Sequence, residues 1–450
     1  MAELRRFRPT DFFLLLLVLA VAGGARAVYL LHHADHGRSA GWLAVQDPRS
    51  EELTALIDNV QDGRGFVGPA PFASEEEATA HTSPGYPYLV GLLGRYVGEQ
   101  RDYYVRWIQV GLGALTAGFY FLFARRAFRS LLVGTITGLA TALNPFWIIN
   151  IAEIDDGTLT SFALGACLFL AGQAGEKGGA LKSLLFGVSL AGLALVRAAL
   201  LPFSFITLIW FLLRSSSLHR GWLCAVCAFL GFANGLAPWA VRNYQLLGEP
   251  VPVVSSAYYH VWIGNNPAAT GGPVSADMLT PTLVDELKPL QQPERYSRLG
   301  KEVVAGISAD PLTALRRRVK ATYAFLFGQQ WIAGGSMVRV EPNPDGDDHI
   351  EAIAPLLLLA SLLGVLTLAF LGWRWSYGWR WESIPAMLAM IWVPLPYILS
   401  HAESLSGPRL PLDGVLICYA AFALCCLVPG VNGPLLDATD SGPRPAPVTR

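Results

Sequence analysis

Long windows without a single charged residue constrain this chain more than any other feature of its sequence. Asp, Glu, Lys and Arg are all absent from residues 131–152, 157–175, 221–241, 352–373, 384–400 and 414–436. A helix of about 20 apolar residues crosses the hydrocarbon core of a bilayer, where a charge costs at least ~2.5–3.5 kcal/mol. Charged residues make up 15% of the chain, against about 25% in ordinary soluble domains. The pattern predicts an all-α polytopic membrane protein and argues against a soluble enzyme.

The apolar segments predict about ten transmembrane helices and two long, partly helical loops. The predicted spans are residues 12–31, 104–124, 131–152, 157–175, 181–197, 199–214, 221–241, 352–373, 384–400 and 414–430. Basic residues fall in alternate short connections, so the positive-inside rule predicts cytoplasmic termini and extracytoplasmic loops 32–103 and 242–351. Residues 1–430 then form one domain in the inner or plasma membrane, and residues 431–450 form a disordered cytoplasmic tail.

The start of the chain has a second interpretation. Residues 12–22 have the length of the apolar core of a secretion signal, and Ala25-Arg26-Ala27 resembles a cleavage site. The apolar run continues to Leu31, however, and Arg26 occupies a position where small neutral residues are preferred. We therefore expect the first helix to be a membrane span.

Most polar residues with catalytic potential fall beside the predicted outer face of the membrane. They are Asp47, Glu51, Glu52, Asp58, Asp62, Glu153, Asp155, Asp156, Arg197, Arg242, His401, Glu403 and Arg409. Because helices bring loop ends together, we expect a polar pocket at this boundary. The 33 basic and 34 acidic residues nearly balance, so the net charge gives no indication of a nucleic-acid partner.

Short motifs rich in Gly, Pro, Asn and aromatic residues are spread along the chain. They include Gly63-Arg64-Gly65-Phe66, Ser83-Pro84-Gly85-Tyr86-Pro87, Asn144-Pro145, Pro238-Trp239-Ala240-Val241-Arg242-Asn243-Tyr244, Trp262-Ile263-Gly264-Asn265-Asn266-Pro267 and Pro408-Arg409. In this order they resemble the C-type polytopic glycosyltransferases, in particular the family-39-like enzymes. That group includes protein O-mannosyltransferases and the aminoarabinose transferases that modify lipid A. The resemblance is specific for the family and not for a substrate.

The resemblance implies a reaction. Such enzymes transfer a sugar from a polyprenyl-phosphate carrier to an acceptor on the extracytoplasmic side. A carboxylate removes the proton of the attacking hydroxyl or amine as general base, and cationic groups stabilise the departing lipid phosphate. The chain is therefore expected to be a hexosyl- or pentosyltransferase. Its partners are then a polyprenyl-phosphate sugar donor, membrane lipids, and a protein, lipid or glycan acceptor.

The chain departs from the family at the first-loop acid that the resemblance implies. In the family this acid lies four residues before a tyrosine, and here Arg49 and Leu53 occupy the two places. The nearest acids are Asp47 and the neighbours Glu51 and Glu52. We expect Asp47 to be the general base, with Glu51 as the alternative. All of them can also be ordinary solvated loop residues.

A second acidic position departs from the family as well. The family's Ser-Glu pair at the start of the fourth span is replaced by Asp156-Gly157, preceded by Asp155. Asp155 or Asp156 can bind the acceptor, orient the donor or hold a metal. Either can also simply cap the following helix, whose N-terminus favours negative charge.

Three arginines are candidates for binding the donor phosphate: Arg197, Arg242 and Arg409. Arginine suits this role because it stays charged and binds phosphate oxygens through two hydrogen bonds. Arg197 can instead extend to lipid headgroups, and the motif around Arg242 can be structural. The other motif residues expected beside the site are Tyr86, Asn243, Asn265 and Asn266. No cofactor is predicted, although some C-type enzymes use a divalent cation.

Two functions of other classes stay open at this point. One is a transporter or flippase for a lipid-linked glycan, which needs ionisable groups near mid-bilayer on broken helices; few lie there in this chain. The other is a non-catalytic scaffold, which would tolerate the loss of Asp47, Asp155 and Arg409. The sequence identifies neither the sugar nor the acceptor.

Overall fold

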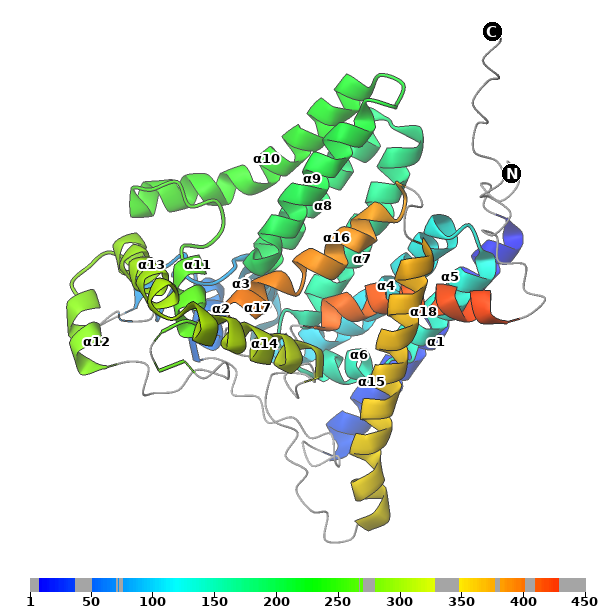
Figure 1. The fold of residues 1–450 in the computed structure, drawn as a ribbon, viewed down its shortest axis with the longest axis horizontal. Coiled ribbons are helices and arrows are strands. Elements are labelled where there is room, and N and C mark those ends of the chain that lie inside the picture. Colours follow the sequence, from blue (N-terminus) through cyan, green and yellow to red (C-terminus); the bar gives the residue numbers. More distant parts are fainter. Residues whose placement is uncertain are drawn as a thin grey trace.

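Almost all of the described chain is helical (Figure 1). The computed structural model describes residues 8–36, 51–69, 72, 76–266, 268–269, 280–327, 348–376, 381–400 and 409–428. The elements are α1 Pro9–His36, α2 Glu51–Gln61, β1 Val67–Gly68, β2 Glu77–Ala78, α3 Gly85–Val97, η4 Gly98–Gln100, α4 Arg101–Ala127, α5 Leu131–Ala142, α6 Pro145–Ile149, η5 Asn150–Ala152, α7 Gly157–Lys177, α8 Ala180–Val196, η6 Ala198–Leu200, α9 Leu201–Ser215, α10 Gly221–Leu247, α11 Ala257–Ile263, α12 Pro281–Leu287, α13 Gln292–Ala309, α14 Pro311–Phe327, α15 Asp348–Ser376, α16 Ile384–Trp392, α17 Leu395–Ser400 and α18 Leu410–Leu427. Strands β1 and β2 pair antiparallel. The predicted tail 431–450 lies outside the described residues.

The chain is a multi-pass membrane protein, but the predicted count of ten spans is not confirmed. In the described part of the chain, six helical segments are long and apolar enough to cross a membrane. They are Pro9–His32, Gly85–Ala127, Gly157–Glu176, Ala198–Ser215, Gly221–Leu247 and Leu410–Leu427. Helices α5 and α6 add a seventh only if they count as one span bent by 49°. The remaining apolar helices are shorter, and the side of the membrane on which the termini lie stays a prediction.

Proline explains why two predicted spans are not single straight helices. Asn144 accepts hydrogen bonds from two backbone N–H groups in the first turn of α6, at 3.0 and 3.3 Å, so a new helix starts at Pro145. Pro394 lies between α16 and α17, where its ring removes a backbone donor. The windows 131–152 and 384–400 are therefore each divided into two helices.

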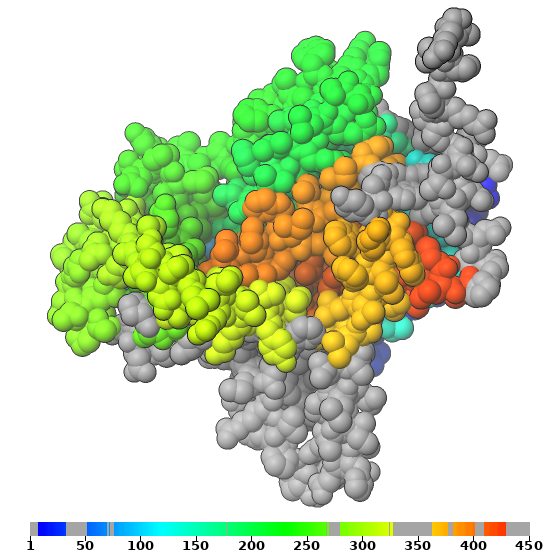
Figure 2. All heavy atoms as spheres, viewed as in Figure 1, coloured from blue at the N-terminus to red at the C-terminus, as the bar shows by residue number. Residues whose placement is uncertain are grey.

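Small residues allow the helices to approach closely. A Cβ at Gly187 in α8 would overlap the carbonyl oxygen of Ala228 in α10, and one at Gly231 in α10 would overlap that of Leu184. Such close backbone contacts are typical of helices that pack in membranes. Helix α18 is surrounded by α5, α7, α15 and α16. On the face drawn in Figure 2, α16 and α17 run between α9 and α14.

Three of the basic residues that predicted the orientation lie at the end of α4 and in the turn that follows it. They form three ion pairs, Arg125–Asp11, Arg126–Glu176 and Arg129–Glu382. Helix α1 begins at this end, whereas α11, α12 and α13 lie at the left of Figure 1, and α14 runs from them toward α15. Helices of the second predicted outer loop thus lie away from these ion pairs, and the orientation itself stays a prediction.

Arg26 is fully buried inside the bundle, where it binds the end of α5. Its Nη1 donates to the carbonyl oxygen of Ala142 at 2.9 Å, and Nη2 lies 3.5 Å from that of Thr141. These are the last residues of α5, and terminal carbonyls of a helix have no partner within it. Gly113 of α4 provides the space, because a Cβ there would overlap the guanidinium. Arg26 therefore caps the break in the bent pair α5–α6.

We expect Arg26→Met to lower the melting temperature of the detergent-purified protein by several degrees. Unsatisfied buried carbonyls cost about 1–3 kcal/mol, and the apolar side chain cannot satisfy them. Intrinsic tryptophan fluorescence during heating measures the effect. Val28→Ala, on an exposed position of the same helix, is the matched control and should melt like the unmodified protein. Equal melting of Arg26→Met would show that Arg26 does not hold the break together.

Candidate functional site

Of the three candidate acids Asp47, Glu51 and Glu52, Glu52 is the one whose side chain the structure describes. Asp47 lies outside the described residues, and only the backbone of Glu51 is described. The distance from the Gly-x-Gly-Phe motif favoured Asp47 and Glu51 over Glu52, although the spacing of apolar residues in α2 contained a signal for Glu52. Leu56 and Val60 are fully buried, and residues four apart share a helix face. Glu52 stands four residues before Leu56 and therefore lies on the buried face of α2.

The side chain of Glu52 is 21% exposed and is held between a hydroxyl and an imidazole. Its Oε1 accepts a hydrogen bond from the Thr82 hydroxyl, and its Oε2 lies 3.8 Å from Nε2 of His81. Burial raises the pKa of Glu52 to about 7, against the opposing effect of the Thr82 hydrogen bond. Burial also lowers the pKa of His81 to about 3, so this imidazole is neutral. A carboxyl group that titrates near neutral pH suits a general base.

Asp156, whose side chain is 20% exposed, forms an ion pair with the buried Arg197 at the second acidic position. Nε of Arg197 donates to Oδ2 of Asp156 at 2.8 Å, and Nη2 donates to Oδ1. The side chain of Arg197 is 3% exposed, and its Nη1 lies 3.4 Å from the hydroxyl of Tyr397 in α17. The two-point contact fixes the plane of the guanidinium.

Asp155 has a different role from its neighbour. Its Oδ1 accepts a hydrogen bond from the Gly157 backbone N–H at 2.7 Å, and its Oδ2 accepts one from the Asn150 amide at 2.8 Å. Burial, together with the adjacent charge of Asp156, raises the pKa of Asp155 to about 7. Asp155 therefore holds the start of α7. Asp156 makes no capping hydrogen bond with its side chain, which leaves that carboxylate for Arg197.

The Ser-Pro-Gly-Tyr-Pro motif brings the two acidic positions together. Thr82, just before the motif, binds Glu52. Ser83 accepts a hydrogen bond from the backbone N–H of Ala198 at 2.8 Å, and Ala198 follows Arg197. Elements that are far apart in sequence, α2 and the α8–η6 junction, thus meet at two consecutive residues.

Gly85 and Tyr86 explain why the motif has this composition. A Cβ at Gly85 would lie 2.9 Å from the carbonyl oxygen of Leu195, so only glycine permits this contact with α8. Tyr86 is buried, and its hydroxyl donates to Gln109 at 3.3 Å. The Gln109 amide in turn donates to the carbonyl oxygen of Glu153 at 2.7 Å. Tyr86 therefore supports the segment that leads into Asp155 and Asp156.

Arg242 and Asn243 connect α10 with the first outer loop. Arg242 donates to the carbonyl oxygens of Thr79, at 2.6 Å, and Phe66, at 3.0 Å. Its guanidinium carbon lies 4.5 Å from the centre of the Trp239 ring, a cation–π contact. The Asn243 amide donates to two carbonyl oxygens of the segment after α10, at 3.0 and 3.1 Å. These motif residues hold the framework of the outer loops.

Asn265 and Asn266 end α11 and join it to its neighbours. Asn265 donates to the carbonyl oxygen of Leu399 in α17 at 3.2 Å. Asn266 donates to that of Ile263 at 3.0 Å, and its own carbonyl oxygen accepts from Arg317 of α14 at 3.1 Å. The motif thus fixes the place where three helices meet.

Arg409 lies just before α18 and is 2% exposed. Its Nε lies 3.0 Å from Oδ1 of Asp413, and Nη1 donates to the carbonyl oxygen of Leu326 at 2.9 Å. All three predicted phosphate-binding arginines thus contact protein groups: Arg197 a carboxylate, Arg242 backbone carbonyls and Arg409 a carboxylate and a carbonyl. Their role in binding a phosphate stays a prediction.

The described carboxylates do not form a site suited to a divalent cation. Within the described ranges, no group of three or more His, Cys, Asp and Glu side chains is placed to hold a metal ion. Asp156 is engaged by an arginine, Asp155 by two N–H groups and Glu52 by a hydroxyl.

Comparison with known proteins finds similarity in structure and not in sequence. No family model and no curated protein matches the chain. The apo oligosaccharyltransferase of Archaeoglobus fulgidus superposes with a TM-score of 0.52 at 13% identity, over 97% of this chain and 52% of the archaeal one. The archaeal oligosaccharyltransferase AglB from Archaeoglobus fulgidus, in complex with an inhibitory peptide and a dolichol-phosphate, gives 0.49 at 13% identity, over 93% of this chain and 50% of its own. ArnT from Cupriavidus metallidurans bound to undecaprenyl phosphate gives 0.36 at 13% identity, over 93% of this chain and 79% of its own.

The superposition with the apo archaeal enzyme covers nearly the whole of this chain. The chain spans about half the length of that enzyme. At 13% identity the likeness concerns the fold alone, and it confirms the fold that the motifs predict. The chain therefore has the membrane fold of the archaeal oligosaccharyltransferase, which is that of the C-type glycosyltransferases.

Proposed function

We propose that this protein is a glycosyltransferase that moves a sugar from a polyprenyl-phosphate carrier to an extracytoplasmic acceptor, with Glu52 as general base. The proposal rests mainly on the junction at Thr82 and Ser83. Thr82 binds the Glu52 carboxyl group, and Ser83 binds the residue that follows Arg197, the partner of Asp156. The archaeal protein that shares this fold is an oligosaccharyltransferase, which supports the same class of reaction. The sugar is a hexose or a pentose, and the acceptor is a protein, a lipid or a glycan.

The proposed chemistry uses one carboxylate and one arginine. The Glu52 carboxylate accepts the proton of the acceptor hydroxyl or amine as that group attacks the anomeric carbon. The new bond joins the acceptor oxygen or nitrogen to this carbon. The bond from the anomeric carbon to the phosphate oxygen breaks, and its electron pair leaves with the polyprenyl phosphate. Arg197, oriented by Asp156, stabilises the charge that develops on the phosphate.

Asp155 and Asp156 complete the proposed site from the side of α7. Asp155 keeps the first turn of α7 in place, and Asp156 orients the arginine. Arg242 supports the site at a distance, because it binds the Phe66 and Thr79 carbonyls of the loop that carries Thr82. Arg409 is a further candidate for the donor phosphate. Asp47 and Glu51 are the alternatives to Glu52 as base.

The proposed function is tested with purified protein and a panel of hexosyl and pentosyl polyprenyl phosphates. We expect at least one donor to be cleaved slowly without an added acceptor, because water can take the acceptor's place. Mass spectrometry detects the released sugar and the free polyprenyl phosphate. The same donors are then placed in one leaflet of sealed vesicles that contain the protein. Movement between leaflets without cleavage would overturn the proposal in favour of a flippase.

A further inference from the structure

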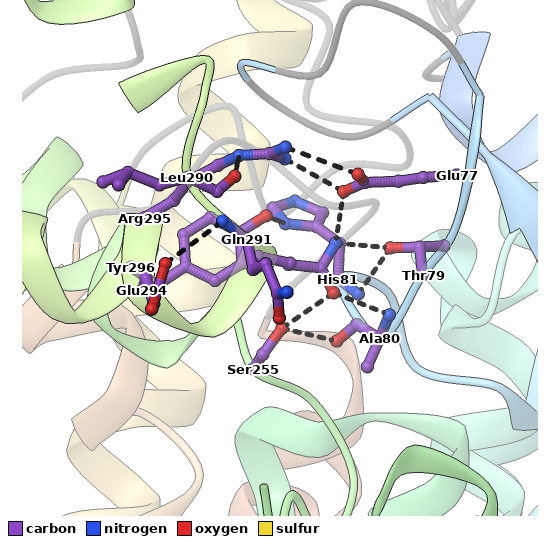
Figure 3. Close-up of polar contacts among 11 residues, drawn as sticks. Glu77, Thr79, Ala80, His81, Ser255, Leu290, Gln291, Glu294, Arg295 and Tyr296 are labelled. Atoms are coloured by element: carbon purple, nitrogen blue, oxygen red, sulfur yellow. Dashed lines mark hydrogen bonds and ion pairs between the residues drawn. The ribbon is translucent and has the colours of Figure 1, made fainter. Parts of the chain in front are cut away.

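One face of α13 holds the segment that leads to Thr82 (Figure 3). Gln292, Arg295 and Tyr296 share this face because they lie three and four residues apart. Gln292 accepts a hydrogen bond from the Ala80 N–H at 2.9 Å and donates to the Thr79 hydroxyl at 2.9 Å. All three side chains are at least nine-tenths buried. The second outer loop therefore fixes the position of the first.

The innermost of these contacts joins Tyr296 to His81. The Tyr296 hydroxyl lies 2.6 Å from Nδ1 of His81, and the two residues are 1% and 6% exposed. Burial raises the pKa of Tyr296 well above its ordinary value, so the hydroxyl keeps its proton. When this hydroxyl donates to Nδ1, the single proton of the neutral imidazole is on Nε2. That nitrogen is the one that faces Oε2 of Glu52, at 3.8 Å.

The other groups described around His81 are aromatic, neutral or paired with an opposite charge. Helix α11 contributes Tyr259 and His260, whose rings lie 5.2 and 5.7 Å from that of His81. Burial lowers the pKa of His260 to about 3, so it too is neutral. Arg295 is paired with Glu77 of β2 at 2.9 Å. Among the described residues, the carboxylate within 4 Å of the imidazole is that of Glu52.

We propose that His81 and Tyr296 are positioning residues for Glu52: the tyrosine hydroxyl selects the Nε2–H form of His81, and this N–H favours the carboxylate form of Glu52. The inference rests on the proposed role of Glu52 as general base. Tyr296 belongs to the second outer loop and Glu52 to the first. The second loop thereby governs the pH at which the base becomes active.

The test variant is Tyr296→Phe, which keeps the ring and removes the hydroxyl. Without its partner, Nδ1 can hold the proton, and the lone pair of Nε2 then faces Glu52. This disfavours the carboxylate, so the midpoint of the Glu52 titration should move up by about 0.5–1 pH unit. His81→Gln keeps an N–H donor and should shift the midpoint less than His81→Leu does. Tyr258→Phe, at an exposed position of α11, is the matched control and should leave it unchanged.

Two readouts separate this inference from the proposed function. The first is the pH profile of donor cleavage. The second is the infrared C=O band of protonated Glu52, identified by its absence in Glu52→Gln and titrated without any substrate. A band whose midpoint rises in Tyr296→Phe supports the inference even if no donor is cleaved. An unchanged or lowered midpoint overturns it, and so does an equal effect of His81→Gln and His81→Leu.

Discussion

Glu52→Gln is expected to lower the turnover of a polyprenyl-phosphate sugar by about 10²–10⁴-fold, the contribution typical of a general base. The amide has nearly the same shape as the carboxyl group and can still contact Thr82, but it cannot accept a proton from the acceptor. Donor binding should therefore be retained while cleavage is lost. Single-turnover measurements with a labelled donor, together with a binding assay, separate the two effects.

The neighbouring acids provide the matched controls for this result. Glu51→Gln and Asp47→Asn should each keep most of the turnover. If Asp47→Asn abolishes cleavage and Glu52→Gln does not, the base is Asp47, as the resemblance to the family suggested. If none of the three matters, the reaction does not depend on a first-loop acid, and the scaffold interpretation gains support.

The pH dependence of the unmodified protein follows from the same carboxyl group. Burial raises the pKa of Glu52 to about 7, and only the deprotonated form can act as base. The apparent kcat/KM should therefore rise with pH and reach half of its plateau near pH 7. For a carboxyl group with its ordinary pKa, the rise would be complete below pH 6. A profile that is flat between pH 5 and 8 would contradict the assignment.

The sequence predicted the kind of fold well because membrane insertion leaves a strong local signal. Each charge-free window corresponds to helix in the described part of the chain. The number of spans was harder to predict, since a proline such as Pro145 divides a window without changing its hydrophobicity. Whether two short helices cross the membrane together depends on their relative angle, which is set by packing. That information is not present in an apolar window.

Candidate site residues that belong to sequence motifs could be predicted from the sequence. Those that are defined by contacts between distant parts of the chain could not. The sequence drew attention to Asp156, Arg197 and Tyr86, and the structure brings them to one region. Counting residues back from the Gly63-Arg64-Gly65-Phe66 motif favoured Asp47 and Glu51 over Glu52. The phase of α2 instead indicates Glu52, and this phase becomes informative only when the buried face of the helix is known. The contact between His81 and Tyr296 joins residues more than 200 positions apart, and no local pattern indicates it.

The buried pair Asp156–Arg197 is expected to show the largest effect on stability. Asp156→Asn removes the carboxylate that binds the Arg197 guanidinium at two points. This guanidinium is 3% exposed, and removing one partner of a buried pair costs on the order of 3–5 kcal/mol. Arg197→Met should be destabilising as well. The double variant should melt at a higher temperature than the two losses together imply, because neither charge is then left alone. Thermal melting of the four proteins in detergent measures this coupling.

The exposed pair Arg298–Glu286, with side chains 37% and 49% exposed, is the control for these measurements. Breaking it should cost no more than about 1 kcal/mol.

Turnover then separates the structural role of Arg197 from its proposed role at the donor phosphate. If the guanidinium stabilises the leaving phosphate, the double variant recovers stability and stays inactive, since methionine offers no charge to the phosphate. A stable double variant with full turnover would show that Arg197 does not bind the donor phosphate. Arg409 would then be the candidate for this role. Additive losses in melting temperature would show instead that the two side chains do not act as a pair.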